Sequence, residues 1–383
     1  MPPETASATS AAPTGAPRRF FRELDSPRMI VSNITPNWFA SVMGTGIVAT
    51  AAATLPVQVP GLRLFAEIVW VIAALLLVVL TIATILHWLW FGQVARGHLA
   101  NPVIAHFYGA PAMAALTVGA GAMLVGTDLI GESAAVGLDT VLWTLGTILG
   151  IISAVTIPYL TFTRHEVSDQ SAFGGWLMPV VPPMVSAATG ALLLPYAPEG
   201  QARLTLLLAC YAMFGLTAIS SFVIITLIWG RLARHKVGAA AAVPTLWIVL
   251  GPLGQSVTAA GLLGANAHLV VDGAWAHALE MFGILYGVPV FGFALMWMGI
   301  VTAVTIRAIR EGLPFSLTWW SFTFPVGTCV TGASALAAHT GSVAFAGIAM
   351  VLYLGLLAAW AIAAVRTFRG AVISGALLAP PRA

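Results

Sequence analysis

The chain has 383 residues, of which 59% are hydrophobic and only 8% are charged, and its formal net charge is +3. An average soluble domain has roughly 25% charged residues, and a soluble chain this apolar would have too little polar surface to cover itself. The composition therefore excludes an ordinary soluble domain and indicates lipid as the solvent. The basic residues stand between apolar runs, where they report membrane orientation and not a nucleic-acid surface.

The first segment, residues 1–30, is a polar tail rich in Ala, Pro, Ser and Thr that ends in a basic stretch. No apolar stretch precedes its arginines, so the pattern is not that of a cleaved signal peptide. We expect a disordered cytoplasmic tail whose arginines meet anionic lipid headgroups. Residues 371–383 are expected to form a second, short cytoplasmic tail.

Between the tails, residues 31–370 contain ten apolar runs with short breaks. Each run has the length of about 20 residues that a hydrocarbon core about 30 Å thick requires, and a backbone inside lipid must satisfy its own hydrogen bonds as a helix. We therefore predict an all-α polytopic membrane protein with ten transmembrane helices. The runs lie near 36–57, 62–90, 102–126, 135–162, 173–195, 202–230, 243–265, 275–306, 314–338 and 341–366.

With ten spans, the breaks alternate between the two sides of the membrane. Fourteen of the 16 lysine and arginine residues then fall on the side of the N-terminal tail, and two fall on the other side. Basic residues accumulate in cytoplasmic loops, so we predict a multi-pass protein of the cell membrane with both termini cytoplasmic. The fourteen are Arg18, Arg19, Arg22, Arg28, Arg96, Arg164, Arg231, Arg234, Lys236, Arg307, Arg310, Arg366, Arg369 and Arg382, and the two are Arg63 and Arg203.

The odd-numbered runs are interrupted by small residues and prolines, and they begin about 70 residues apart. Proline kinks a helix, glycine lets backbones approach closely, and a broken helix facing lipid would leave carbonyl groups unpaired. We predict five repeated hairpins in a quasi-fivefold ring, with the odd helices lining a central pore; tight helix packing alone is the alternative. The elements are Gly44-Thr45-Gly46, Gly109-Ala110-Pro111, Pro182-Pro183, Gly251-Pro252-Leu253-Gly254 and Phe324-Pro325-Val326-Gly327.

Few ionisable residues lie inside the runs. Glu67 and Glu280 are near the extracellular ends, and His87 and His106 are near the cytoplasmic ends, where they either act in the pore or reach the interface. The sequence has no metal-ligand spacing and no defensible catalytic grouping, so we predict no cofactor, no metal and no enzyme activity. Without a fixed central charge, a pore selects by its diameter, hydroxyl groups, helix-end dipoles and flanking charge.

Four motifs resemble those of the tellurite-resistance/dicarboxylate transporter family. Residues 36–47, Pro-Asn-Trp-Phe-Ala-Ser-Val-Met-Gly-Thr-Gly-Ile, are similar to its first helix, and residues 319–325, Trp-Trp-Ser-Phe-Thr-Phe-Pro, to its ninth. Residues 176–183, Trp-Leu-Met-Pro-Val-Val-Pro-Pro, and 251–256, Gly-Pro-Leu-Gly-Gln-Ser, resemble helices five and seven. The resemblance runs from about residue 30 to residue 370.

This resemblance implies five helical hairpins around a central pore, with one pore in each subunit of a homotrimer. It also implies a phenylalanine on the ninth helix that plugs the pore. By motif this gate is Phe324, with Phe322 as the second choice, because residues two apart on a helix point in different directions. A bulky apolar ring blocks hydrated ions in a narrow neutral pore.

The family includes fungal malate permeases, fungal sulfite exporters, bacterial tellurite-resistance proteins and plant slow-type anion channels. It implies transport of small anions across the bilayer, with C4-dicarboxylates such as malate as the first choice. A sulfite exporter or an inorganic-anion channel is the alternative, and a membrane sensor or enzyme is a remote one. In this interpretation Gly44, Gly46, Pro111, Pro183, Gly254 and Gly327 set the width of the pore, and Thr45, His106 and Gln255 offer hydrogen bonds. Pro325 is also expected to line the pore.

Overall fold

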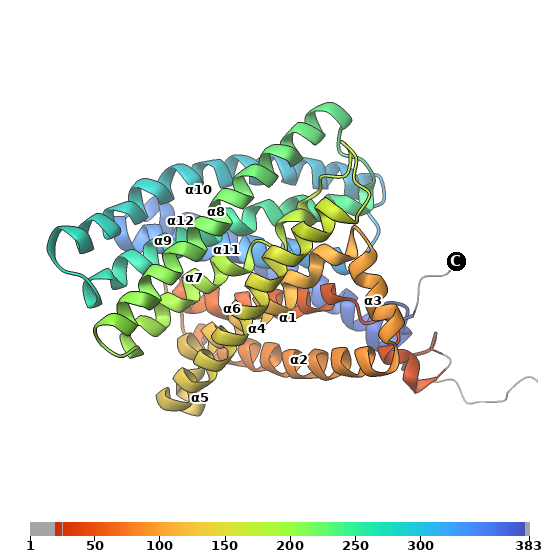
Figure 1. The fold of residues 1–383 in the computed structure, drawn as a ribbon, viewed down its shortest axis with the longest axis horizontal. Coiled ribbons are helices and arrows are strands. Elements are labelled where there is room, and N and C mark those ends of the chain that lie inside the picture. The colour runs from red at the N-terminus through yellow and green to blue at the C-terminus, as the bar shows by residue number, and fades with distance from the viewer. Residues whose placement is uncertain (1–19, 25, 380–383) are drawn as a thin grey trace, which may run out of the picture.

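The computed structural model describes residues 20–24 and 26–379. Every regular element of this part is helical, with no strand, so the predicted all-α class is confirmed. Figure 1 shows long helices lying side by side. The α-helices are α1 (Ala40–Thr54), α2 (Leu62–Trp90), α3 (Gly92–Ala100), α4 (Gly109–Gly121), α5 (Thr127–Ile130), α6 (Glu132–Thr163), α7 (Pro182–Leu193), α8 (Gln201–His235), α9 (Leu250–Asn266), α10 (Gly273–Arg310), α11 (Phe324–Thr340) and α12 (Val343–Phe368).

A 3₁₀ segment precedes five of these helices, one in each predicted hairpin. Each segment contains at least one aromatic residue, a residue class that collects at membrane–water interfaces. The five are η2 (Pro36–Phe39), η3 (Ile104–Tyr108), η5 (Gly174–Leu177), η7 (Ala240–Val249) and η9 (Leu317–Phe322), before α1, α4, α7, α9 and α11 respectively. The other short segments are η1 (Pro27–Val31), η6 (Leu194–Tyr196) and η8 (Ala267–Leu269), and the π-helical η4 (Ala122–Gly126) and η10 (Arg369–Ser374).

The prolines of this region begin helices and do not kink them. Pro183 and Pro325 are the second residues of α7 and α11, and Pro111 is the third residue of α4. The first turn of a helix has N–H groups without intrahelical partners, so a proline there removes nothing that the helix uses. The expected proline kinks are therefore replaced by a change from 3₁₀ to α geometry just before each proline.

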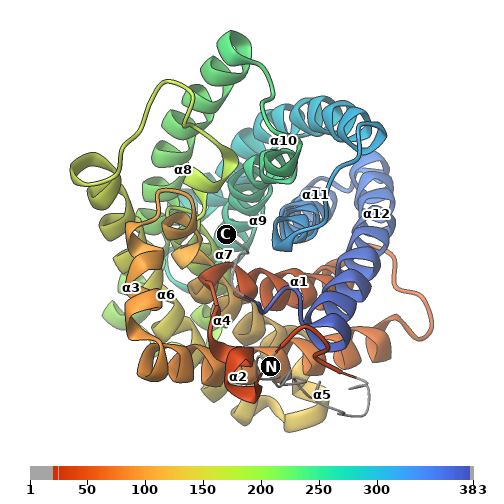
Figure 2. The same cartoon turned by 90° about the vertical axis from the view of Figure 1, so that its right-hand side faces the viewer.

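The helices α1, α4, α7, α9 and α11 form a closed cycle of contacts, in which each touches the next and α11 returns to α1. The 3₁₀ segments before them repeat this cycle in the same order. We call these five the inner helices. In Figure 2 they lie inside a circle formed by the longer helices α2, α6, α8, α10 and α12.

These longer outer helices each pack against the inner helix before them in the chain and against the next inner helix of the cycle. Their outward side chains are apolar and open: Leu89 of α2 is 71% exposed and Phe222 of α8 is 75% exposed. Such a surface requires lipid around it. The inner helices are almost wholly covered, as the first 13 residues of α1 illustrate.

Seven helical stretches of the described chain are long and apolar enough to cross a membrane, so the protein is a multi-pass membrane protein. They are the five outer helices and the two stretches that contain α4 and α9. The inner helices α1, α7 and α11 have 15, 12 and 17 residues and are shorter than a span by themselves. Ten membrane crossings therefore remain a prediction.

The two ends of the described chain lie together. The Phe21 N–H donates to the Val372 carbonyl oxygen at 2.9 Å, and the Glu23 N–H donates to that of Ser374 at 2.8 Å. Most of the expected disordered tail, residues 1–19 and residue 25, lies outside the described residues. Residues 20–24, by contrast, are attached to η10, so both ends of the described chain reach one face of the molecule. We call this the terminal face.

Candidate functional site

A cavity of about 370 Å³ lies at the centre of the inner helices. Every residue of its wall comes from one of the five inner helices or from η4, which continues α4. The wall mixes apolar side chains with hydroxyl and amide groups, and it contains one histidine, His339, but no aspartate, glutamate, lysine or arginine. A mainly apolar cavity with hydroxyl and amide groups in its wall, enclosed by all five repeats, is the best candidate for a route through the molecule.

Besides Thr54 of α1, five threonines lie in this wall, one from each inner helix. The five hydroxyl groups all donate to a carbonyl group three or four residues earlier in their own helix, which leaves their oxygen lone pairs for the cavity. The pairs are Thr50 to Ile47 at 3.4 Å, Thr117 to Met113 at 2.7 Å, Thr189 to Val185 at 2.9 Å, Thr258 to Gly254 at 3.1 Å and Thr331 to Thr328 at 3.1 Å. The sequence analysis missed these threonines.

Phe324 closes the cavity toward the terminal face. It is the first residue of α11 and is only 2% exposed. Its side chain lines the central cavity and also a second cavity of about 20 Å³, whose wall includes Met43, Met178 and Ile248. Phe324 is the one residue that the two walls share, so its ring lies between the wide central cavity and a much smaller apolar one.

Phe322 has different surroundings. It belongs to η9 and makes edge-on ring contacts with Trp247 at 5.4 Å and with Trp319 at 5.6 Å between centroids. These rings form a cluster among the 3₁₀ segments, away from both cavity walls. Of the two phenylalanines named from the motif, the structure thus brings only Phe324 to the axis.

Of the other residues expected to line the pore, two meet a cavity. Gln255 lies in the wall of the central cavity, and Pro325 lies in that of the small one. Pro111 and Pro183 occupy the first turns of α4 and α7 and belong to neither wall. They shape the start of an inner helix.

The four glycines expected to set the pore width lie at contacts between helices. A Cβ atom built on Gly44 would lie 2.7 Å from the Trp320 ring, and one on Gly46 would lie 2.7 Å from Thr117. At Gly327 it would meet Ile47 at 2.3 Å. At Gly254 it would lie 2.5 Å from the backbone nitrogen of Cys329, so α9 and α11 touch there through their main chains. These glycines allow the close approach of neighbouring helices, and their effect on the width of a pore stays a prediction.

Thr45 and His106 point away from the cavity. The Thr45 hydroxyl accepts a hydrogen bond from the Trp360 indole N–H at 3.2 Å, so it joins α1 to the outer helix α12. His106 is buried in η3, where its ring stacks on Trp176 at 6.1 Å and meets the edge of Phe173 at 5.7 Å. Thr45 therefore connects an inner helix to an outer helix, and His106 belongs to an aromatic cluster with Phe173 and Trp176.

The ionisable residues singled out from the sequence also lie off the axis. Glu67 forms an ion pair with Arg63 at 3.2 Å, and Glu280 lies exposed beside His277 at 3.8 Å. A buried carboxylate that the sequence analysis missed is Asp139 of α6, which packs against Gly119 of α4. Neither of its oxygens has a hydrogen-bond partner within the described chain. No group of three potential metal ligands occurs in that part either.

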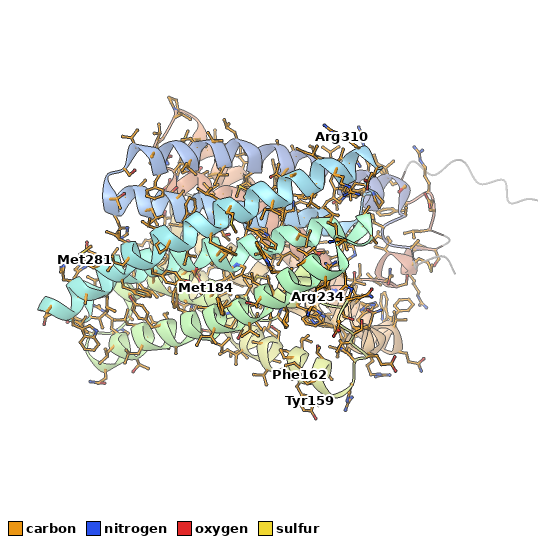
Figure 3. All side chains as sticks on the ribbon, turned by 90° about the horizontal axis from the view of Figure 1, so that it is seen from above. Tyr159, Phe162, Met184, Arg234, Met281 and Arg310 are labelled. Carbon is orange, nitrogen blue, oxygen red and sulfur yellow. The ribbon has the colours of Figure 1, made fainter. Side chains whose placement is uncertain are left out.

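Positive charge is distributed unevenly between the two ends. Arg234 and Arg310 lie toward the terminal face, whereas Met281 lies toward the opposite one (Figure 3). Two arginines at the opposite end, Arg63 and Arg203, form hydrogen bonds that connect neighbouring hairpins. Arg63 donates to Asp128 at 2.8 Å and to the Val125 carbonyl oxygen, and Arg203 donates to the carbonyl oxygens of Ala197 and Leu269.

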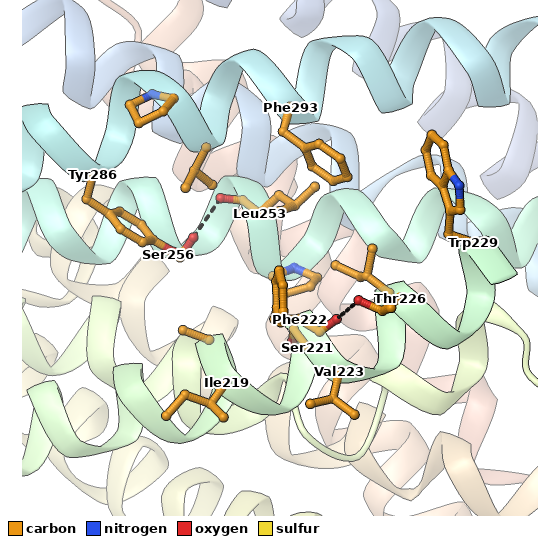
Figure 4. Close-up of a pocket in the computed structure, with 15 residues that line it drawn as sticks. Ile219, Ser221, Phe222, Val223, Thr226, Trp229, Leu253, Ser256, Tyr286 and Phe293 are labelled. Atoms are coloured by element: carbon orange, nitrogen blue, oxygen red, sulfur yellow. Dashed lines mark hydrogen bonds between the residues drawn. The ribbon is translucent and has the colours of Figure 1, made fainter.

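A larger cavity, about 760 Å³, is a groove between α8 and α10 on the outer side of α9. Figure 4 shows its apolar side chains, among them Ile219, Phe222 and Phe293, around the Ser256 hydroxyl that donates to the Leu253 carbonyl oxygen. Because outer helices form two of its sides, this groove faces lipid. Its size does not make it a route across the membrane.

Comparison with known proteins agrees with this architecture. The family model described as voltage-dependent anion channel matches residues 33–368. A sulfite efflux pump of Arthroderma otae is 29% identical over 82% of this chain and 84% of its own length, and one of Trichophyton rubrum is 30% identical over 79% and 81%. An uncharacterised transporter of Methanocaldococcus jannaschii is 27% identical over 79% and 83%. The resemblance drawn from the four motifs is confirmed, and the chain belongs to the voltage-dependent anion channel family of anion transporters.

Proposed function

We propose that the protein lets small oxyanions cross the membrane through the central cavity and that Phe324 is the gate. The observation that supports this proposal is the position of Phe324, the one residue that lines both the central cavity and the small cavity beyond it. An apolar ring in a neutral passage holds back hydrated ions by its bulk and by dewetting. Displacing the ring joins the two cavities.

Sulfite is the substrate that we favour. The named relatives above include sulfite efflux pumps, and sulfite is small enough for a passage that narrows at Phe324. The C4-dicarboxylate that the sequence analysis ranked first is the second candidate, because a central cavity of about 370 Å³ also accommodates a four-carbon molecule. An inorganic-anion channel would use the same route.

The orientation and assembly follow the same reasoning. The excess of lysine and arginine on the terminal face supports cytoplasmic termini, and we propose a protein of the cell membrane on that basis. The resemblance supports a homotrimer with one pore in each subunit. In this arrangement the central cavity faces the outside and the aromatic 3₁₀ segments face the cytoplasm.

The decisive experiment measures flux into proteoliposomes that hold the purified protein, with sulfite, malate, nitrate and chloride compared with and without a pH gradient. Sulfite flux that follows only its own gradient supports a channel-like exporter. Malate flux driven uphill by protons supports a coupled dicarboxylate transporter. Absence of flux for all four anions, with correct insertion verified, would reject the proposal.

A further inference from the structure

One wall of the central cavity is more polar than the others. Gln255 and Thr258 lie one turn apart on α9, and Thr331 and Ser334 lie one turn apart on α11. The hydroxyl oxygens of Thr258 and Thr331 are 2.7 Å apart. We call these four residues the polar stripe. With a rise of about 1.5 Å per residue on two parallel helices, the stripe extends roughly 9 Å along the axis.

Two members of the stripe have unused hydrogen-bonding groups. The Ser334 side chain is 4% exposed, and its hydroxyl has no hydrogen-bond partner within the described chain. The Gln255 side chain is 5% exposed and takes part in none of the hydrogen bonds formed by the described residues. A buried polar group left unpaired costs about 1–3 kcal/mol, so both side chains are prepared for a ligand that enters the cavity.

The rest of the wall offers no equivalent groups. Thr50, Thr117 and Thr189 each donate their hydroxyl proton to their own helix. Thr54 also donates to its own helix, and Nδ1 of His339 lies 2.8 Å from the Ala335 carbonyl oxygen. The remaining side chains there, such as Leu124 and Val185, are apolar. Free donors are therefore gathered where α9 and α11 meet, and the main-chain contact at Gly254 fixes the relative position of these two helices.

We infer that the polar stripe is a binding station for singly protonated oxyanions, such as hydrogensulfite, on the way through the cavity. This inference rests on the proposed function. An oxyanion accepts hydrogen bonds from the Gln255 amide or the Ser334 hydroxyl, and its own O–H donates to a threonine oxygen of the stripe. A halide ion has no proton to donate, so it uses the donors Gln255 and Ser334 but not the threonine oxygens. Neutral donors hold the anion weakly enough for it to leave, as conduction requires.

The test compares sulfite with chloride in proteoliposomes at a mildly acidic pH, in a Phe324→Ala background so that the gate does not limit flux. Ser334→Ala and Gln255→Leu should each raise the half-saturating sulfite concentration about tenfold, the value of one hydrogen bond to a charged group. The half-saturating chloride concentration should rise as well, because chloride accepts hydrogen bonds from the same two donors. Thr331→Val removes an acceptor oxygen of the stripe, so it should weaken sulfite alone. Thr189→Val is the comparison variant, because its hydroxyl lies in the same cavity but donates to its own helix. It should change the half-saturating sulfite concentration much less than either substitution in the stripe.

A second measurement does not depend on flux. Sulfite should raise the melting temperature of the purified protein, and Ser334→Ala with Gln255→Leu should abolish this rise. If anions pass but neither substitution alters sulfite saturation, or if Thr189→Val alters it equally, the stripe is not a binding station and the proposed function stands. If no anion passes, even in the Phe324→Ala background, the proposed function and the inference are both rejected.

Discussion

Phe322 is the last residue of η9, and Phe324 is the first residue of α11. The two side chains lie in different surroundings. The ring of Phe324 separates two cavities on the axis, whereas the ring of Phe322 packs on Trp247 and Trp319 among the 3₁₀ segments. The pair therefore gives a matched comparison within one motif, in which the same side chain is removed at two neighbouring sites.

Phe324→Ala should raise anion flux at least several-fold, because it removes the side chain that divides the passage. Phe322→Ala should leave flux at the wild-type level and lower the melting temperature, since it removes the partly buried ring contacts with Trp247 and Trp319. Flux into proteoliposomes and thermal unfolding of the purified protein measure the two effects. Equal flux from wild type and Phe324→Ala, with a folded protein, would remove Phe324 as the gate.

A histidine outside the spanning stretches makes stability depend on pH. His98 of α3 is buried, and its ring stacks on that of His87 at 5.2 Å. Burial, with a smaller contribution from His87, lowers the pKa of His98 below its ordinary value of 6.5. In that case the unfolded chain binds a proton that the folded protein does not, so stability should fall as pH drops below about 6.5.

This effect is checked by melting temperatures measured between pH 5 and pH 7. His98→Asn should reduce the loss of stability at the acidic end, because it removes the titrating group. His268→Asn, at an exposed histidine, should reproduce the wild-type curve. A wild-type melting temperature that is flat over this range would contradict the prediction.

At the level of single residues, the sequence predicted which helix segments lie near the axis better than it predicted which side chains form the cavity wall. Phe324, Gln255 and Pro325 were found through their motifs, and the structure places each against a cavity. Thr45 and Gln255 are both polar residues of inner helices, yet a helix has several faces and no pattern in the sequence says which one is inward. Each repeat has a threonine in the cavity wall. These threonines went unnoticed because the repeat was aligned on glycine and proline.

At the level of elements, glycine positions govern how closely two inner helices approach. Gly254 of α9 lies against the main chain of α11, which no side-chain rearrangement can relieve. Gly251, nearly one turn earlier on the same helix, has no atom within 4 Å of where a Cβ would stand. An alanine at Gly254 therefore tests steric crowding, whereas an alanine at Gly251 tests helix propensity alone.

Gly254→Ala should lower the stability of the purified protein by about 1–3 kcal/mol, the usual cost of overpacking a filled contact. Gly251→Ala should be neutral or stabilising by up to about 1 kcal/mol, since alanine is the better helix former. Thermal unfolding in detergent distinguishes them. Similar melting temperatures for the two variants would show that α9 and α11 can separate without cost.

The hairpin repeat was predictable, but the local geometry of its inner helices was not. Small residues at a spacing of about 70 residues indicated five equivalent units, and the contacts between helices follow the order that such units require. The 3₁₀ segments were not foreseen, because their apolar and aromatic residues are equally suited to an α-helix. The helix α3 was missed because its nine residues lie between two long apolar runs.

At the level of the whole molecule, both ends of the described chain lie on one face, where residues 21 and 23 hydrogen-bond to residues 372 and 374. We predict that tags fused to either terminus are on the same side of the membrane and, from the distribution of arginines, that this side is the cytoplasm. Protection of both tags from an added protease in intact cells, and cleavage after permeabilisation, measures this. Opposite protection of the two tags would mean an odd number of crossings.

The ring is closed between its first and last hairpins by packing between α11, α12 and α1, with no covalent connection of neighbouring units at that joint. During synthesis, a chain that has emerged only as far as α10 is an open arc with no enclosed passage. The hairpin that completes the ring is the one that carries Phe324. Under the proposed function, a newly inserted chain therefore acquires its passage and its gate in the same step, and an unfinished molecule does not leak.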